Sequence, residues 1–131
     1  MHPKMIDIED RLRLLLDRLD NFLEDAYGSI YPLHPNRLAR GKASSPSYDG
    51  LFTVHAKFTL GYGTAEGRGY VVAISLSTLQ HVDETVRDEI IEDAVGFLEE
   101  HIPEFFPERE LHVKKDGDVY KISGDFSLGD A

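Results

Sequence analysis

The chain has 131 residues, of which 41% are hydrophobic and 29% are charged, and it carries a formal net charge of −10. This composition is typical of one globular domain with an ordinary core and excludes a natively disordered chain. Because the chain has no cysteine, it can form neither disulfides nor thiolate metal sites, and it has no cysteine nucleophile.

The sequence shows no sign of membrane insertion or export. No apolar run approaches the ~18 residues that a membrane-spanning helix needs. The first ten residues also lack the basic and then apolar layout of a secretory signal. We therefore expect a cytoplasmic protein of bacterial type that makes no contact with a membrane.

The charge is unevenly distributed along the chain. Residues 1–26 carry a net charge of −3, residues 27–82 carry +3 and residues 83–131 carry −10. An acidic protein is repelled by nucleic-acid backbones unless basic charge is locally concentrated. Any anion bound by this chain is therefore expected at residues 27–82.

The first predicted element is a helix over residues 5–26. Its apolar side chains recur in alternating steps of three and four residues, which gives a helix one apolar face. These residues are Met5, Ile8, Leu12, Leu15, Leu19, Phe22 and Ala26. Leu16 and Leu23 widen the stripe, which favours packing on a sheet over a coiled coil.

Residues 27–50 are predicted to form a long basic loop. The segment contains three prolines, three glycines and four serines, which disfavour a long helix or strand. Loops of this length are uncommon in compact domains and are usually functional or mobile. A short helical turn is expected at residues 36–40.

A hairpin follows. Apolar and polar residues alternate strictly over residues 51–60, and residues 70–76 form a second strand after a glycine-rich tip. The side chains expected to face the core are those of Phe52, Val54, Ala56, Phe58, Leu60, Tyr70, Val72, Ile74 and Leu76.

The last third of the chain is predicted to contain a helix and a second hairpin. The helix begins after Asp83, a good N-cap, and is expected to end at Pro103. Asp116 and Gly117 form a strong two-residue hairpin turn. That turn sets Val113 opposite Tyr120, and Leu111 opposite Ile122.

The order α-β-β-α-β-β predicts a single two-layer α+β domain over residues 1–131. A four-stranded, mainly antiparallel sheet is expected to carry both helices on one face. Size, acidity and element order together resemble small dimeric secretion-chaperone-like folds in shape. The resemblance implies a protein-binding or chaperone-like role.

Familiar cofactor and metal motifs are absent from the sequence. The glycines at 61, 63, 67 and 69 lie between two strands, whereas a dinucleotide fingerprint lies between a strand and a helix. We interpret them as a wide hairpin tip. The six histidines form no H-x-H or H-x-x-x-H pair, so we predict no metal and no cofactor. One alternative remains open, a cross-strand pair of His55 and His112.

Basic residues and nearby proton carriers in the middle of the chain are the candidates for an anion or ligand site. They are Arg37, Arg40, Lys42, Tyr48, His55, Lys57 and Arg68. Tyr48 or His55 would carry the proton. Such a site, between the 27–50 loop and the 61–69 tip, would make the protein a small-molecule or anion-handling enzyme.

The sheet face opposite the helices is the predicted interaction surface. Strand alternation directs several polar and small apolar side chains to this open face. The interface candidates on it are Val71, Ala73, His112, Lys114 and Lys121. No aromatic residue is expected there, which disfavours the base stacking by which sheets bind single-stranded nucleic acid.

No catalytic constellation accompanies the two conspicuous loops. We therefore expect a non-enzymatic protein-binding or adaptor module that acts through the open sheet face and the loops at 27–50 and 61–69. Its partner would be another protein or a second copy of the chain. The alternative is the anion-handling enzyme.

Overall fold

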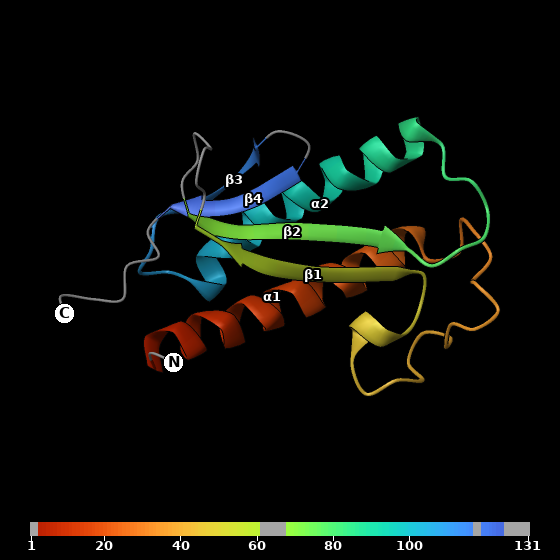
Figure 1. Ribbon diagram of the computed structural model, residues 1–131, viewed down its shortest axis with the longest axis horizontal. Coiled ribbons are helices and arrows are strands. Elements are labelled where there is room, and N and C mark those ends of the chain that lie inside the picture. The colour runs from red at the N-terminus through yellow and green to blue at the C-terminus, as the bar shows by residue number, and fades with distance from the viewer. Residues whose placement is uncertain (1–2, 61–67, 117–118, 125–131) are drawn as a thin grey trace.

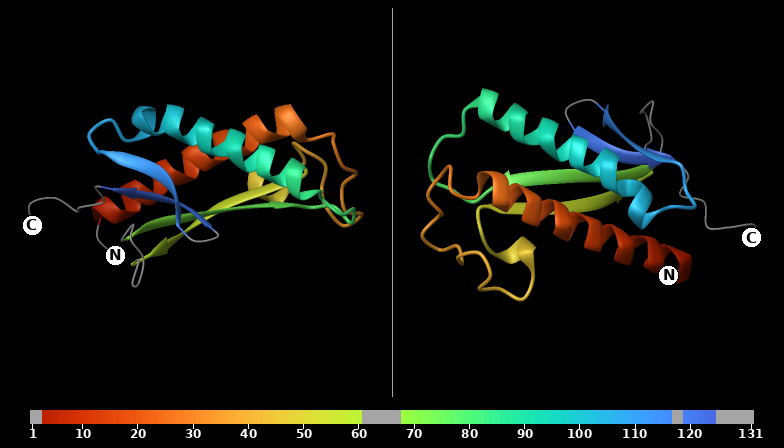
Figure 2. Two further views of the ribbon diagram at one scale, coloured as in Figure 1. Left: turned by 90° about the horizontal axis from the view of Figure 1, so that it is seen from above. Right: turned by 180° about the vertical axis from the view of Figure 1, so that it is seen from behind.

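The computed structural model describes residues 3–60, 68–116 and 119–124. They form an α+β fold in which two helices cover one face of a four-stranded antiparallel sheet (Figures 1 and 2). The elements in chain order are α1 (Pro3–Tyr27), the 3-10 turn η1 (Pro46–Tyr48), β1 (Phe52–Thr59), β2 (Gly69–Leu76), α2 (Glu84–Phe105), β3 (Leu111–Asp116) and β4 (Val119–Gly124). The predicted fold class and element order are confirmed.

The strands lie in the order β1-β2-β4-β3, so the two hairpins of the chain meet through β2 and β4. β1 pairs with β2 over all eight residues of each strand. β2 pairs with β4 over only four residues, from Gly69 opposite Ser123 to Val72 opposite Tyr120. The C-terminal half of β2 therefore extends past the end of β4 (Figure 1).

The core lies between the helices and the inner face of the sheet. Its buried apolar residues are Ile8, Leu12, Leu15, Leu16, Leu19 and Leu23 of α1, Ile90, Ala94, Leu98 and Ile102 of α2, Leu51 just before β1, Phe106 just after α2, and Phe52, Val54, Tyr70, Val72, Val113 and Ile122 of the strands. The predicted faces of α1, β1 and β2 are thus largely confirmed. Two residues differ: Ala26 is exposed, and Leu60 is 52% exposed beyond the end of β1. The side chain of Met5 lies outside the described part.

The second hairpin has a different register from the predicted one. Val113 lies opposite Ile122 rather than Tyr120, and Asp116 lies opposite Val119. The predicted register was therefore wrong by two residues. A shift of two keeps every side chain on its face. The observed register also sets fully buried Ile122 between Val113 and Tyr70, in one continuous row of the core.

Two local predictions about helices were also wrong. α2 does not end at Pro103 but continues to Phe105, because Ile102 and Phe106 are buried in the core and keep the last turn in place. In the 27–50 loop, the short helical turn lies at Pro46–Tyr48 rather than at 36–40. Neither α1 nor α2, in their described residues, has an apolar stretch that meets the length of a membrane span.

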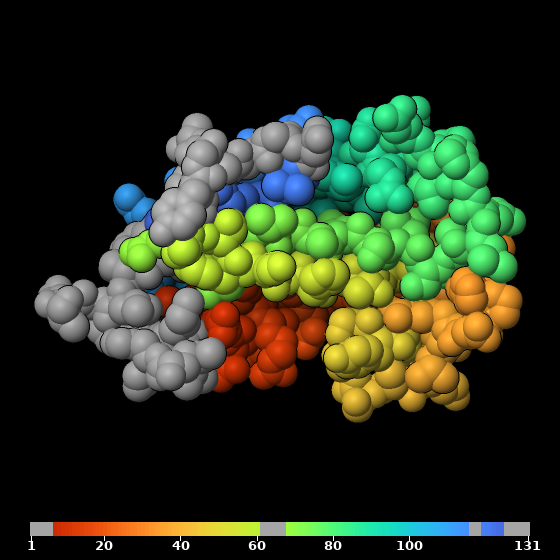
Figure 3. All heavy atoms as spheres, viewed as in Figure 1, coloured from red at the N-terminus to blue at the C-terminus, as the bar shows by residue number. Residues whose placement is uncertain are grey.

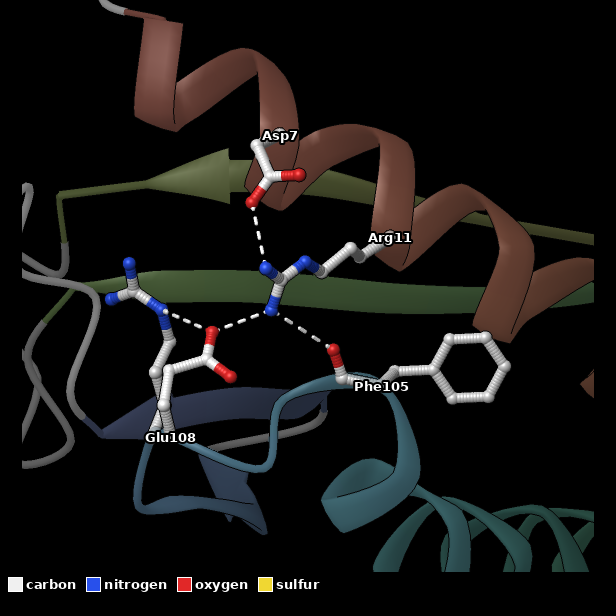
Figure 4. Close-up of polar contacts among 5 residues, drawn as sticks. Asp7, Arg11, Phe105 and Glu108 are labelled. Carbon is white, nitrogen blue, oxygen red and sulfur yellow. Dashed lines mark hydrogen bonds and ion pairs between the residues drawn. The ribbon is translucent and has the colours of Figure 1, made fainter.

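Arginines of α1 hold the C-terminal end of α2. Arg11 donates to the carbonyl oxygen of Phe105 at 3.2 Å and forms ion pairs with Asp7 and Glu108 (Figure 4). About two helical turns further along α1, Arg18 pairs with Glu104 at 3.0 Å. The bond from Arg11 satisfies one of the terminal carbonyl groups of α2, which have no partner within the helix. The contacts of Arg11 and Arg18 fix the two helices side by side over the sheet.

Candidate protein-binding groove

Arg37 holds the 27–50 loop in place from within. Its Nε and Nη2 atoms donate hydrogen bonds of 3.0–3.1 Å to the carbonyl oxygens of Ser47, Asp49, Gly50 and Phe52 and to Oγ1 of Thr53. Carbonyl oxygens are strong acceptors for a guanidinium group. Arg37, the first of the residues predicted to bind an anion, therefore donates its hydrogen bonds mainly to the protein's own backbone.

Two buried carboxylates complete the framework of the loop. Glu24 of α1 accepts the N–H of Phe52 through Oε1 at 2.8 Å. Asp49 accepts the N–H groups of Gly41 and Ala43 through Oδ2, at 3.0 and 2.9 Å. Burial raises the pKa of Glu24, while the bond from Phe52 opposes this rise. The loop is thus tied to α1 at its end and to itself across its middle.

Asp20 lies one helical turn before Glu24 and is 2% exposed. Its Oδ2 atom has no hydrogen-bond partner among the described residues. Burial, followed by the negative charges of Glu24, Asp49 and Asp17, raises the pKa of Asp20 to about 7, while Arg37 opposes the rise. The carboxyl group of Asp20 therefore changes from protonated to ionised near neutral pH.

Gly50 packs closely against the side chain of Glu24. Gly50 has φ +71°, and a Cβ atom there would lie 2.3 Å from Oε1 of Glu24. We expect Gly50→Ala to lower the free energy of unfolding by about 2–3 kcal/mol, because backbone strain and a clash add. Gly41 has φ +86° with nothing within 4 Å of a Cβ. Gly41→Ala should cost only about 1 kcal/mol of strain. Equal losses for the two variants in chemical denaturation would contradict the packing of Glu24 on Gly50.

The other anion candidates of the loop do not join Arg37. Arg40 turns back to α1 and pairs with Asp25 at 2.7 Å. Lys42 is exposed, and Tyr48 is 68% exposed at the end of η1. Among the described residues, no hydrogen bond or ion pair joins one of these side chains to another, and none of them lines the pocket that Arg37 lines.

The remaining candidates lie along the hairpin. His55 and Lys57 are exposed on the open face of β1, and Arg68 precedes β2 at the far end of the hairpin from the loop. Eight residues of strand separate the two ends by about 26 Å. The structure therefore does not bring the seven anion candidates together. Residues 61–67 of the predicted tip lie outside the described residues.

The five interface candidates have different surroundings. His112 and Lys114 are exposed on β3. Lys121, predicted on the same exposed face, is only 1% exposed, so its charge does not reach solvent. Val71 and Ala73 are half-buried in β2, where they line a groove described below.

A histidine pair across the sheet is ruled out by the strand order. β1 and β3 are the two edge strands, so His55 and His112 are separated by two strands and by about 14 Å across the sheet. The alternative of a cross-strand site was therefore wrong. Among the described residues, no group of three or more His, Asp or Glu side chains is arranged to hold a metal ion.

An apolar groove of about 290 Å³ runs between α2 and the C-terminal half of β2. Ala73 and Ile74 line it from β2, Ile91 and Val95 from α2, and Val119 from the start of β4. The groove lies beside the part of β2 that has no pairing with β4. Figure 3 shows β2 and the N-terminal half of α2 side by side on this face of the molecule.

The same part of β2 has an unpaired backbone edge. Ser77 donates to the carbonyl oxygen of Leu51 at 2.7 Å, so the odd-numbered residues at this end of β2 direct their backbone groups toward β1. The even-numbered residues face the other way. Val72 reaches β4 there, whereas Ile74 and Leu76 have no strand partner on that side among the described residues. The apolar groove and an open strand edge thus coincide.

The outer wall of the groove is acidic. Glu84, Asp88 and Glu92 follow each other at four-residue intervals, so they form one row along α2, beside the row of Arg87, Ile91 and Val95. All three carboxylates are exposed, and none forms an ion pair with another described residue. Arg87 is the one charged residue that lines the described groove.

One signal for this groove is present in the sequence, in the apolar residues of α2, although no motif points to it. Ile91 and Val95 make the apolar arc of α2 wider than the buried residues Ile90, Ala94 and Leu98 require. A wide apolar arc indicates a second surface beside the core. Of the residues that line the groove, only Val71 and Ala73 were predicted as interface residues. The alternation of the strands does not show that α2 forms the other wall.

Comparison with known proteins identifies a family and a relative, but neither has a described activity. A family model described as "Uncharacterised protein" matches residues 3–124. An uncharacterised protein of Borreliella burgdorferi is 43% identical over 108 residues, which cover 82% of this chain and 84% of that protein. No solved structure matches the chain. The match of the family model over nearly the whole chain shows that the protein belongs to this family of uncharacterised proteins.

Proposed function

We propose that the protein is a non-enzymatic protein-binding module that receives an extended segment of a partner protein between α2 and β2. The observation that carries the proposal is the coincidence of the apolar groove with the open edge at Ile74. Extended peptides bind such edges through main-chain hydrogen bonds, and alternate side chains enter the neighbouring groove. An incoming strand would pair with β2 beyond Val119, the first residue of β4.

A protein partner suits this surface better than a second copy of the chain. Pairing of two β2 edges would bring two copies of the acidic row, Glu84, Asp88 and Glu92, toward each other. Like charges brought together at an interface oppose association. The net charge of −10 adds to the repulsion between two copies.

The proposal is tested with a proline at the open edge. Ile74→Pro removes an N–H that faces the groove and leaves the hydrogen bonds between β2 and β1 intact. The probe is a fluorescent octapeptide in which threonine and valine alternate. We expect saturable binding to the unmodified protein, with affinity about tenfold lower for Ile74→Pro because one main-chain hydrogen bond and close approach are lost.

The other edge of the sheet provides the matched control. Ala56 of β1 also directs its N–H away from the sheet, on the edge far from the groove. Ala56→Pro should bind the octapeptide as the unmodified protein does. Fluorescence anisotropy measures the affinities, and slower amide exchange at Ile74 locates the peptide. No binding, or undiminished binding to Ile74→Pro, would count against the proposal.

A further inference from the structure

We infer that the partner segment is cationic, an extended strand that carries apolar side chains together with lysine or arginine. This inference rests on the proposed function and adds the chemistry of the partner. It follows from the order of surfaces across α2. Moving outward from β2, an incoming side chain meets first the apolar row of Ile91 and Val95, and then the row of Glu84, Asp88 and Glu92.

Lysine and arginine side chains match this sequence of surfaces. Their aliphatic stems cover apolar area, and their charged heads lie beyond it in polar surroundings. A basic side chain entering the groove can therefore lay its stem over Ile91 and Val95. Its head then reaches Glu84, Asp88 or Glu92, which have no basic partner among the described residues.

The wider charge distribution acts in the same direction. Residues 83–131, which include α2, carry a net charge of −10. Such a field raises the association rate of cationic partners and slows that of acidic ones. An acidic segment in the groove would find only Arg87 to offset the carboxylate row.

Three octapeptides test the inference, each with valine at alternate positions and with lysine, threonine or glutamate between them. We expect the lysine peptide to bind most tightly and the glutamate peptide most weakly, with the differences shrinking as salt is raised. Replacing the row by Glu84→Gln, Asp88→Asn and Glu92→Gln together should lower the affinity of the lysine peptide by about tenfold, since three exposed charge contacts are lost. The affinity of the threonine peptide should stay unchanged.

A second triple variant separates the row from the overall charge. Glu89→Gln, Glu100→Gln and Glu110→Gln remove the same number of charges from exposed positions outside the row. This variant should keep most of the affinity for the lysine peptide. If the two triple variants lose affinity equally, or if all three peptides bind equally well, the inference is overturned while the proposed function stands. If no peptide binds, both are overturned.

Discussion

Arg37→Ala is expected to lower the free energy of unfolding by about 3–5 kcal/mol, because a buried acceptor left without its donor costs about 1–3 kcal/mol and Arg37 serves several partly buried acceptors. One guanidinium group satisfies four carbonyl oxygens and one hydroxyl oxygen around the end of the loop. Alanine would leave these acceptors without that donor. It would also remove the positive charge that opposes the carboxylates of Asp20 and its neighbours.

Chemical denaturation measures this loss, and amide exchange locates it. Exchange should accelerate first at residues 38–50, since these depend on Arg37 for their attachment to the sheet. Arg37→Lys is the matched variant, because it keeps the charge but lacks the planar fork of donors. We expect it to recover only part of the stability, with a loss of about 2 kcal/mol. A loss below about 1 kcal/mol for Arg37→Ala would show that the loop is held by other contacts.

Asp20→Asn is expected to stabilise the protein above neutral pH. The pKa of Asp20 is raised from 3.8 to about 7 in the folded chain. Between about pH 4 and pH 7 the folded protein therefore holds a proton that the unfolded chain has released. Its stability falls as pH rises through this window and levels off above it. At pH 8 the variant, which has no charge to bury, should be more stable by roughly 2–4 kcal/mol.

Unfolding free energies measured from pH 4 to pH 8 check this prediction. The two proteins should have similar stability near pH 4, where Asp20 is protonated in the folded chain and only partly ionised in the unfolded one, and should diverge toward pH 7. Asp10→Asn, which neutralises an exposed carboxylate of the same helix, provides the control. Parallel pH profiles for the unmodified protein and Asp20→Asn would contradict the buried, unpartnered position of Asp20.

The fold was predictable from the sequence because local patterns determine it. The three- and four-residue spacing of Leu12, Leu15 and Leu19 gave the buried face of α1, and strict alternation gave that of β1. The register of β3 and β4 was missed, because a shift of two residues moves no side chain to the other face. Alternation cannot distinguish the two registers.

The site was less predictable, because it depends on contacts between distant residues. The sequence shows Arg37 as one basic residue in a basic loop, and its acceptors are 10 to 16 residues away. Likewise, Lys121 follows the strand pattern of an exposed residue but is buried. The wide apolar arc of α2 indicates a second surface, but no local pattern shows that β2 lies beside it.

The groove exists because the second hairpin is shorter than the first. β1 and β2 have eight residues each, whereas β3 and β4 have six, and Val119 begins β4 close to the middle of β2. A second hairpin longer by three residues in each arm would lay its own backbone along Ile74 and Leu76. The chain would then fill its groove with itself. The length of the second hairpin thus decides whether the edge of β2 at Ile74 and Leu76 stays open or is paired with the chain's own backbone.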